Sequence, residues 1–279
     1  MLSGVKERLE SPSSILAFMQ CPRKYYYRYV RGLEPERSIH LFVGSIVHAS
    51  IQDFHNIKVE RIPRQGFYDT LRFGMMQFFE RNWDENAHEF EKLGLSSEEI
   101  AFHRGEARLM LDNFCQHHTA KMMAEQYRHN ISLWEAFTRL RPRSETKIKS
   151  DKLGVMGVID AIHDIDGETL IIDYKTSKKN EIDRDCLIQL AIYALLYKEL
   201  TGKSPDRVGI HFLRHGERIL NVSPGLLALG EEKCAEIRNL NRSDEQEDYP
   251  KRKSGLCKYK TGQCDYYEVC KPWNSTRFS

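Results

Sequence analysis

The sequence predicts an α/β fold in which a mixed sheet is flanked by helices. Two neighbouring apolar runs, Val155 to Ile162 and Thr169 to Tyr174, read as strands joined by a tight turn at Asp166-Gly167. A helical pattern at 184–201 is followed by strand patterns at about 206–214 and 217–222. Phe, Met and Leu recur at helical spacing over 66–91 and 97–129, which predicts an α-helical insertion without a catalytic motif.

The remaining elements complete this plan. A first helix is expected at 13–30, after the start signal Ser11-Pro12-Ser13, and a second at about 42–58. A strand is expected at 133–149 and a last helix at 224–241. We therefore expect four segments: an N-terminal helix (1–41), a helical subdomain (42–132), a core of sheet and helices (133–241) and a cysteine-rich end (242–279).

Composition limits the possible functions. The chain has 279 residues, 41% of them hydrophobic, which is enough to bury a sizeable core in one or two domains. Its formal net charge of +2 does not indicate a globally basic nucleic-acid binder, so any DNA contact rests on local patches such as Lys178-Lys179. We find no signal peptide and no membrane-spanning run, and we expect a cytoplasmic protein without a membrane partner.

The acidic residues on the two central strands suggest chemistry. Asp160 and Asp173 each follow an apolar triplet, and Lys175 lies two residues beyond the second carboxylate. Singly, such residues are often turn aspartates or solvated ion pairs. Two neighbouring carboxylates, however, repel unless a cation lies between them, and oxygen ligands suit Mg²⁺ or Mn²⁺. This pattern indicates metal-assisted phosphodiester hydrolysis.

A wider set of motifs resembles a known family. The set runs from Ser14-Ile-Leu-x-Phe-x-x-Cys21-Pro-x-x-Tyr25 and Gly44-x-x-x-His48 through Asp160 and Ile-Ile-Asp173-Tyr-Lys175-Thr-Ser to Gln189-x-x-x-Tyr193. It is similar to the RecB-like branch of the PD-(D/E)XK nuclease superfamily, which includes the RecB and AddB nuclease domains, exonuclease V and the CRISPR-associated adaptation exonucleases. The resemblance covers roughly residues 13–271 and implies a restriction-endonuclease-like αβββαβ core.

The resemblance also implies roles for individual residues. Asp160, Asp173 and the backbone carbonyl of Tyr174 would bind the metal ion, with His48 as an additional ligand that favours manganese. Lys175 would orient or deprotonate the attacking water. Glu145 could be a further ligand or an exposed strand glutamate. Gln189 and Tyr193, at i and i+4 of one helix, would face the active site and the nucleic acid.

Four of the seven cysteines form a separate pattern. Cys257, Cys264 and Cys270 follow one another with gaps of six and five residues in a segment with little apolar periodicity. In the iron-sulfur members of the family that the chain resembles, three such cysteines and one near the N-terminus hold a structural 4Fe-4S cluster that links the chain ends. The resemblance implies that Cys21 is the N-terminal ligand here. The family's first gap is two residues rather than six, and zinc is the competing ligand of a four-thiolate site. The other three, Cys115, Cys186 and Cys234, are expected to be buried core thiols.

We therefore expect a metal-dependent DNA nuclease that acts as an exonuclease on single-stranded DNA or DNA ends. One alternative is a non-catalytic DNA-end-binding or assembly subunit with the same fold. Another is a zinc-stabilised α/β protein with no role on nucleic acid. No Walker motif occurs, so a helicase partner would be a separate chain, and a recombination or CRISPR-adaptation protein is a further possible partner.

Overall fold

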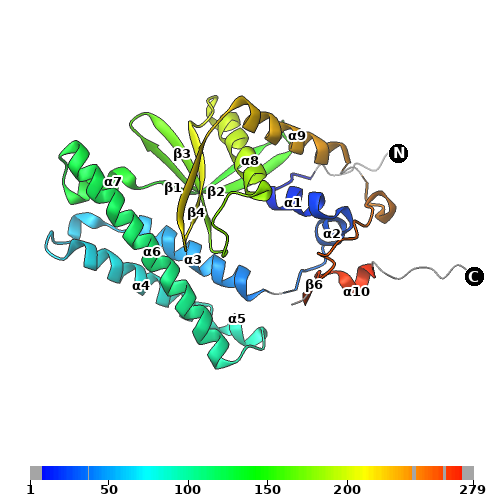
Figure 1. The fold of residues 1–279 in the computed structure, drawn as a ribbon, viewed down its shortest axis with the longest axis horizontal. Coiled ribbons are helices and arrows are strands. Elements are labelled where there is room, and N and C mark those ends of the chain that lie inside the picture. The colour runs from blue at the N-terminus through cyan, green and yellow to red at the C-terminus, as the bar shows by residue number, and fades with distance from the viewer. Residues whose placement is uncertain (1–7, 37, 241–242, 260–261, 272–279) are drawn as a thin grey trace, which may run out of the picture.

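A five-stranded sheet separates two groups of helices (Figure 1). This computed structural model describes residues 8–36, 38–240, 243–259 and 262–271. The strands lie in chain order across the sheet: β1 (Arg143–Ser150), β2 (Val155–Ile165), β3 (Glu168–Lys175), β4 (Arg207–Phe212) and β5 (Gly216–Asn221). Strands β3 and β4 are parallel, and the other neighbouring pairs are antiparallel. The mixed sheet flanked by helices is therefore confirmed.

The two connections on either side of β3 follow local sequence signals. Asp166 and Gly167 join β2 to β3 with φ values of 55° and 82°, the left-handed conformation that a two-residue hairpin turn requires. Helix α8 (Arg184–Thr201) joins the parallel strands β3 and β4, which need a long crossover. The side chain of Asp183 begins this helix by accepting the backbone N–H of Cys186 at 2.9 Å.

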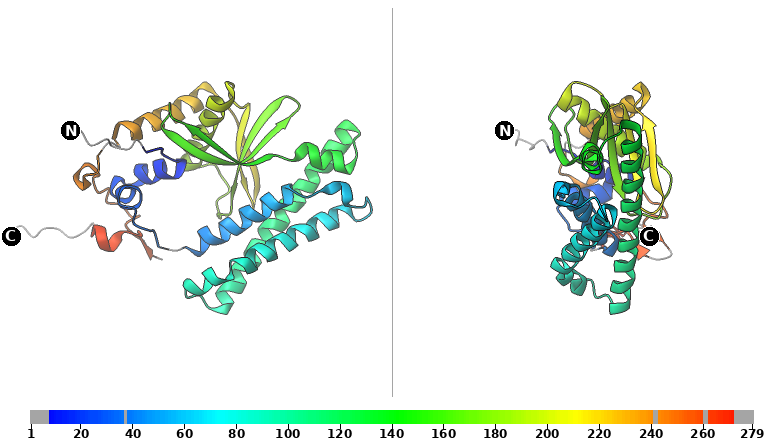
Figure 2. Two further views of the ribbon diagram at one scale, coloured as in Figure 1. Left: turned by 180° about the vertical axis from the view of Figure 1, so that it is seen from behind. Right: turned by 90° about the vertical axis from the view of Figure 1, so that its left-hand side faces the viewer.

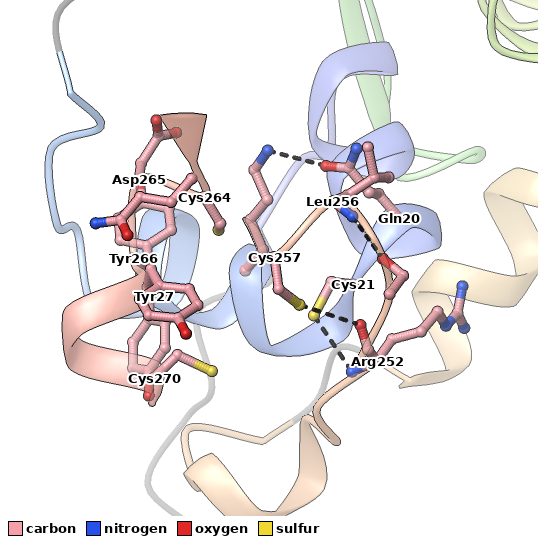
Figure 3. A pocket seen from close by; sticks show the side chains of 14 residues that line it. Gln20, Cys21, Tyr27, Arg252, Leu256, Cys257, Cys264, Asp265, Tyr266 and Cys270 are labelled. Atoms are coloured by element: carbon pink, nitrogen blue, oxygen red, sulfur yellow. Dashed lines mark hydrogen bonds between the residues drawn. The ribbon is translucent and has the colours of Figure 1, made fainter. Parts of the chain in front are cut away.

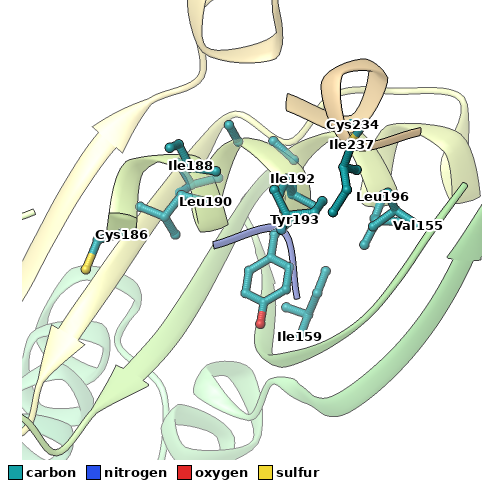
Figure 4. Packing of buried hydrophobic residues seen from close by; sticks show 14 of the residues in the cluster. Val155, Ile159, Cys186, Ile188, Leu190, Ile192, Tyr193, Leu196, Cys234 and Ile237 are labelled. Carbon is teal, nitrogen blue, oxygen red and sulfur yellow. The ribbon is translucent and has the colours of Figure 1, made fainter. Parts of the chain in front are cut away.

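One face of the sheet is covered by α8, α1 (Pro12–Gln20) and α9 (Pro224–Leu240). Figure 4 shows apolar side chains of α8 lying between the sheet and α9, and Leu196 belongs to this core together with Ile159 of β2 and Ile237 of α9. Cys186 and Cys234 are buried in the same core, and Cys115 is buried on the opposite side of the sheet. The three cysteines predicted to be core thiols are therefore buried, as expected.

The opposite face is covered by the helical subdomain, whose helices lie together beside the sheet in Figure 2. They are α3 (Ile39–His55), α4 (Phe67–Glu85), α5 (Ala87–Lys92), α6 (Ser97–His129) and α7 (Leu133–Leu140). The expected strand at 133–149 is wrong in its first half, because Ser132 and Glu135 form a reciprocal capping box that begins α7. None of the described helices is both long and apolar enough to cross a membrane.

The expected first helix at 13–30 is also interrupted. Cys21 has an extended backbone (φ −161°, ψ 114°), since a residue before proline is disfavoured in the helical region. Proline 22 then begins α2 (Pro22–Tyr25), which continues as a π-helical turn, η1 (Tyr26–Val30). The break leaves the Cys21 side chain at the junction between two helices. Residues 1–7 and 272–279 of the expected end segments lie outside the described residues.

The C-terminal segment packs against these N-terminal helices. It contains a 3₁₀ turn η3 (Gln246–Asp248), a short hairpin of β6 (Lys258–Tyr259) and β7 (Gly262–Gln263), and α10 (Tyr267–Cys270). Tyr249 is fully buried and stacks on Tyr25 at 5.9 Å between ring centroids, while its carbonyl accepts the Arg23 Nε–H at 2.7 Å. The segment has little apolar periodicity in its sequence, and buried aromatic side chains such as Tyr249 contribute to its packing instead.

Candidate functional site

Three acidic residues lie at one level across strands β1, β2 and β3. The register of β1 and β2 places Glu145 opposite Asp160. The β2–β3 ladder begins at the pair Ala161 and Ile172, so one further step places Asp160 opposite Asp173. Neither of these facing acidic pairs belongs to the ladder. The strands are therefore locally unpaired where the carboxylates meet.

Local backbone irregularity accounts for this break. Glu145 has a left-handed φ of 48°, which is uncommon for a residue with a side chain and incompatible with regular pairing. On β2, Ile159 and Ile162 pack into the same core although they are three residues apart, while Ala161 packs into the opposite core. The two-residue alternation of a strand therefore shifts at Asp160. Such departures from regular geometry often occur beside functional sites.

The imidazole of His48 joins two of these carboxylates. His48 lies on α3, and its Nδ1 is 3.5 Å from Oδ2 of Asp160. One ligand atom from each of His48, Glu145 and Asp160 lies within 4.8 Å of the others, a spacing at which they could share a metal ion. Burial opposes protonation of His48, but the hydrogen bond and negative charge of Asp160 raise its pKa above the usual value. The imidazole and carboxylates thus form one electrostatically coupled group.

Asp173 belongs to a second network directly beside this group. Its Oδ1 accepts a hydrogen bond from Nε2 of Gln189 at 2.8 Å, and its Oδ2 lies 2.7 Å from Nζ of Lys175. The lysine Nζ also donates to Oε1 of Gln189 at 2.8 Å, and the Gln189 Nε2 is 3.0 Å from the Tyr193 hydroxyl. The facing side chains of α8 therefore position the acid and the lysine of β3.

The carboxylate of Asp173 is buried under unusual electrostatic conditions. Only 2% of the residue is exposed, and burial raises its pKa to about 6 despite the nearby ammonium group of Lys175. The Lys175 contact lacks hydrogen-bond geometry, and Oδ2 has no hydrogen-bond partner among the described residues. A buried anionic oxygen is costly unless a cation is nearby, and the ammonium group of Lys175 supplies one here. Because a carboxylate oxygen can accept more than one contact, this oxygen could also bind a metal ion.

Tyr174 contributes to the site through its backbone. Its N–H donates to Oδ2 of Asp160 at 2.8 Å, and the residue lines a cleft together with His48, Glu145 and Asp160. Its side chain, however, is turned toward the helical subdomain, where the hydroxyl is 3.2 Å from Nε2 of His55. The structure therefore separates the buried tyrosine ring from the polar backbone at the cleft.

A cleft of about 550 Å³ opens over this group and continues into a neighbouring cavity. His48, Glu145, Asp160 and Lys175 all line the cleft. A second cavity of about 530 Å³ has four lining residues in common with it, namely His40, Leu41, Thr176 and Ser177. Because the cleft and the second cavity have these lining residues in common, together they extend beyond His48, Glu145 and Asp160. An extended ligand could therefore occupy both.

The two lysines expected to contact nucleic acid have different environments. Lys178 lines the second cavity together with Arg214. Lys179 instead forms an ion pair with Asp183 at the start of α8 and lines neither the cleft nor the second cavity. Arg214 and Phe102 both line the second cavity, and neither was expected there from the sequence. The Phe102 residue is 59% exposed. Phe102 follows a helical apolar pattern that normally indicates core, so its exposure is not apparent from that pattern.

The four cysteines predicted to be ligands line one cavity, shown in Figure 3. Its volume is about 270 Å³, and its lining includes Cys21 from the junction of α1 and α2 together with the three C-terminal cysteines Cys257, Cys264 and Cys270. All four are free thiols and partly exposed. Among the described residues, no three cysteines bring their sulfur atoms within 4.8 Å of one another. The thiols therefore surround a space rather than meeting at a point.

Several contacts hold the two sides of this cavity together. The Arg252 backbone N–H donates to Sγ of Cys21 at 3.5 Å, and Nζ of Lys251 donates to the Cys270 carbonyl at 2.6 Å. The Tyr266 hydroxyl donates to the carbonyl of Leu33 at 2.9 Å. The first and last of these bonds join residues that are 231 and 233 positions apart, and so they hold the N-terminal helices against the C-terminal segment. The cavity is consequently a defined part of the fold.

Comparison with known proteins agrees with the fold. No curated protein sequence matches the chain. A solved structure from Eubacterium rectale described as "Putative exonuclease" is 14% identical, with a TM-score of 0.50 over 90% of this chain and 86% of that chain. The structure of SSO0001 matches more weakly, with 18% identity, a TM-score of 0.30 and coverage of 55% of this chain and 66% of that chain.

The sequence profile of the PD-(D/E)XK nuclease superfamily matches residues 10–271. That range includes the acidic group, the network of α8 and all four cysteines of the cavity. By this match over nearly its whole length, the chain belongs to the PD-(D/E)XK nuclease superfamily.

Proposed function

We propose that the protein is a metal-dependent DNA nuclease that acts as an exonuclease on single-stranded DNA or DNA ends. The observation that carries this proposal is the convergence of His48, Glu145 and Asp160 beside the buried Asp173 and Lys175. An imidazole and several carboxylate oxygens suit Mn²⁺ or Mg²⁺. Oδ2 of Asp173 is buried with Lys175 as its cationic neighbour, and its remaining acceptor capacity suits a metal ion.

The metal ligands in this proposal are His48, Asp160 and Asp173, with Glu145 and the backbone carbonyl of Tyr174 as additional donors. When bound, a divalent ion neutralises the phosphate and lowers the pKa of a bound water. Glu145 faces Asp160 across the strands, and burial together with the charge of Asp160 raises its pKa. A ligand set under such mutual repulsion favours binding of a positive ion.

Lys175, Gln189 and Tyr193 act on the attacking water and the phosphate. The charge of Asp173 outweighs the effect of burial and raises the pKa of Lys175, so its side chain is an ammonium group at neutral pH. In that state it orients the water and offsets negative charge developing on the phosphate. Gln189 bonds to both Lys175 and Asp173, and Tyr193 bonds to Gln189. This chain of hydrogen bonds holds the ammonium group of Lys175 in place beside Asp173.

The cavity beside the cleft is a suitable path for a nucleic-acid strand. Lys178 lines it and provides positive charge for phosphates, whereas Arg214, which also lines it, is paired with Glu106. Phe102 lines the same cavity with an exposed ring on which a base could stack, and base stacking is available only where bases are unpaired. The combination of cationic side chains and an exposed aromatic ring supports single-stranded DNA as the substrate.

The cysteine cavity is proposed to hold a structural 4Fe-4S cluster. A single zinc ion with bonds of about 2.3 Å to sulfur would bring its thiolates within about 4 Å of one another. The sulfur atoms here are more widely arranged around a cavity of about 270 Å³. A larger polynuclear group matches this spacing better than zinc does. The six-residue gap between Cys257 and Cys264 is accommodated by the hairpin of β6 and β7.

Cleavage of end-labelled single- and double-stranded DNA in magnesium, manganese or chelator tests the nuclease proposal. Asp173→Asn removes one charge at nearly constant shape, and Lys175→Ala removes the ammonium group. Each should reduce cleavage by at least about a hundredfold while DNA binding is largely retained. Metal-independent cleavage, or near wild-type rates for either variant, would overturn the proposal. Binding to DNA ends without cleavage by the wild-type protein would instead support a non-catalytic end-binding function.

A further inference from the structure

A second group of metal-binding side chains lies between α6 and the sheet, among residues that do not line the cleft. His117 comes from α6, His211 from β4 and Glu217 from β5. One ligand atom from each lies within 4.8 Å of the other two. Oε1 of Glu217 is 3.3 Å from Nε2 of His117 and 3.7 Å from Nδ1 of His211. The register of the β4–β5 hairpin pairs His211 with Glu217, and α6 adds His117 from a distant part of the sequence.

These distances match the geometry of a zinc site. Zinc binds imidazole nitrogen and carboxylate oxygen at about 2.0–2.2 Å, so tetrahedral ligands lie about 3.3–3.5 Å from one another. Two imidazoles and one carboxylate form a ligand set that suits zinc better than magnesium or calcium, which prefer oxygen ligands alone. The measured separations of 3.3 and 3.7 Å therefore require little adjustment.

The surroundings of the group also favour a metal ion. His211 is only 3% exposed, so its imidazole is held inside the protein. The Nε2 atom of His117 is buried and has no hydrogen-bond partner among the described residues, although it points toward the carboxylate of Glu217. A buried ring nitrogen without a partner is destabilising. A metal ion would satisfy it.

One cation already approaches the same carboxylate. Nζ of Lys121, one turn after His117 on α6, donates to Oε1 of Glu217 at 2.6 Å. Its side chain is 33% exposed, so it can move toward solvent without crossing the protein interior. The lysine would therefore compete with a metal ion for Glu217 but would not block access to it.

We propose that His117, His211 and Glu217 form a zinc site, distinct from the nuclease cleft, that fastens α6 to strands β4 and β5. Because the ligands come from the helical subdomain and the far edge of the sheet, a bound ion cross-links the two. The described part of the chain supplies three protein ligands, which leaves one coordination position for water. Metal that binds the folded state alone must raise the stability of that state.

Zinc titration of the full-length protein tests this proposal. The chain is dialysed against EDTA, and zinc chloride is then added in competition with a chromophoric chelator, with melting temperature measured in parallel. Wild-type protein should bind about one more zinc per chain than His117→Ala or Glu217→Gln, and zinc should raise its melting temperature more. The control His88→Ala removes an exposed histidine of α5 and should retain wild-type zinc content. Comparing variants cancels any zinc held by the cleft or the cysteines.

Lys121→Met separates a metal site from an ordinary ion-pair network. If zinc and the ammonium group compete for Glu217, removing the lysine charge should tighten zinc binding severalfold. If the network is complete without metal, the variant should simply be less stable and gain no affinity for zinc. Equal zinc content in wild type and His117→Ala, with both folded by circular dichroism, would overturn the proposal. So would unchanged zinc affinity in Lys121→Met.

Discussion

The backbone N–H of Tyr174 donates to Oδ2 of Asp160 at 2.8 Å across two neighbouring strands. The β2–β3 ladder has already ended at this level, so a carboxylate replaces the carbonyl that a regular sheet would supply. The same oxygen lies 3.5 Å from Nδ1 of His48. Asp160 therefore has two functions that can be separated experimentally: it completes the backbone hydrogen bonding of β3, and it supplies negative charge to the cleft.

Asp160→Asn and Asp160→Ala should separate these two functions. An asparagine retains an oxygen that can accept the Tyr174 N–H, so its melting temperature should remain near wild type. Alanine leaves that N–H without its partner and should cost about 1–2 kcal/mol of unfolding free energy. Both variants lose the charge, and both should lower cleavage by at least about a hundredfold. Urea denaturation and cleavage assays of the same preparations would check this, and full activity of the asparagine variant would contradict it.

DNA binding should depend on Lys178 more than on Lys179. Lys178 lines the cavity beside the cleft, whereas Lys179 is paired with Asp183. A lysine that neutralises one phosphate contributes about one unit to the dependence of log affinity on log salt. We expect Lys178→Ala to reduce that slope by about one unit, with a smaller change for Lys179→Ala. Fluorescence anisotropy at several salt concentrations measures both, and the reverse order would place the DNA elsewhere.

Loss of one cysteine ligand should affect colour and stability together. Protein purified anaerobically should be brown, and Cys21→Ala or Cys264→Ala should bleach it, lower the melting temperature and expose the C-terminal segment to proteases. The control Cys115→Ala alters a thiol buried in the opposite core and should leave colour and iron content unchanged. Absorbance near 400 nm and iron analysis check the prediction. Colourless protein with about one zinc per chain would exclude the cluster but not the nuclease.

Buried histidines should make the fold sensitive to acid. Burial lowers the pKa of His118 to about 3, whereas the unfolded chain has a histidine pKa of about 6.5. The unfolded state therefore binds an extra proton between these values, and stability falls as pH decreases below about 6.5. At pH 5 this residue alone should cost about 2 kcal/mol relative to pH 7.

Replacing that histidine tests the assignment. His118 packs among Phe54, Phe114 and Phe137, and its Nε2 has no hydrogen-bond partner among the described residues. In His118→Phe the unfolding free energy should therefore decrease less between pH 7 and pH 5, as measured in urea. His88→Ala, which removes an exposed imidazole, should show the wild-type decrease. An identical pH dependence in all three proteins would mean that His118 does not cause it.

Much of the fold can be predicted because its signals are local. The hairpin at Asp166-Gly167 and the limits of α8 follow from turn residues and helical periodicity. The strand expected at 133–149 and the helix expected at 13–30 are both interrupted by local signals in the sequence. Ser132 and Glu135 form the capping box that begins α7, and Pro22 ends the first helix at Cys21.

The candidate site was predictable only in part, because its geometry depends on contacts between distant elements. The motif residues of β2, β3 and α8 do come together, and His48 approaches them from α3. The left-handed backbone of Glu145 and the exposure of Phe102 have no local signal in the sequence. In the group formed by His117, His211 and Glu217, the hairpin of β4 and β5 pairs the last two, but His117 joins them only when α6 lies across the sheet.

The meeting of the chain ends at the cysteine cavity also sets an order of events during synthesis. Arg252, whose N–H contacts the Cys21 thiol, is translated 231 residues after that cysteine. Cys21 must therefore leave the ribosome long before the three later thiols exist. If the cavity holds a cluster, its delivery is a late step that only a chain translated beyond Cys270 can accept. A product truncated before Cys257 would lack all three later thiols and could not complete the site.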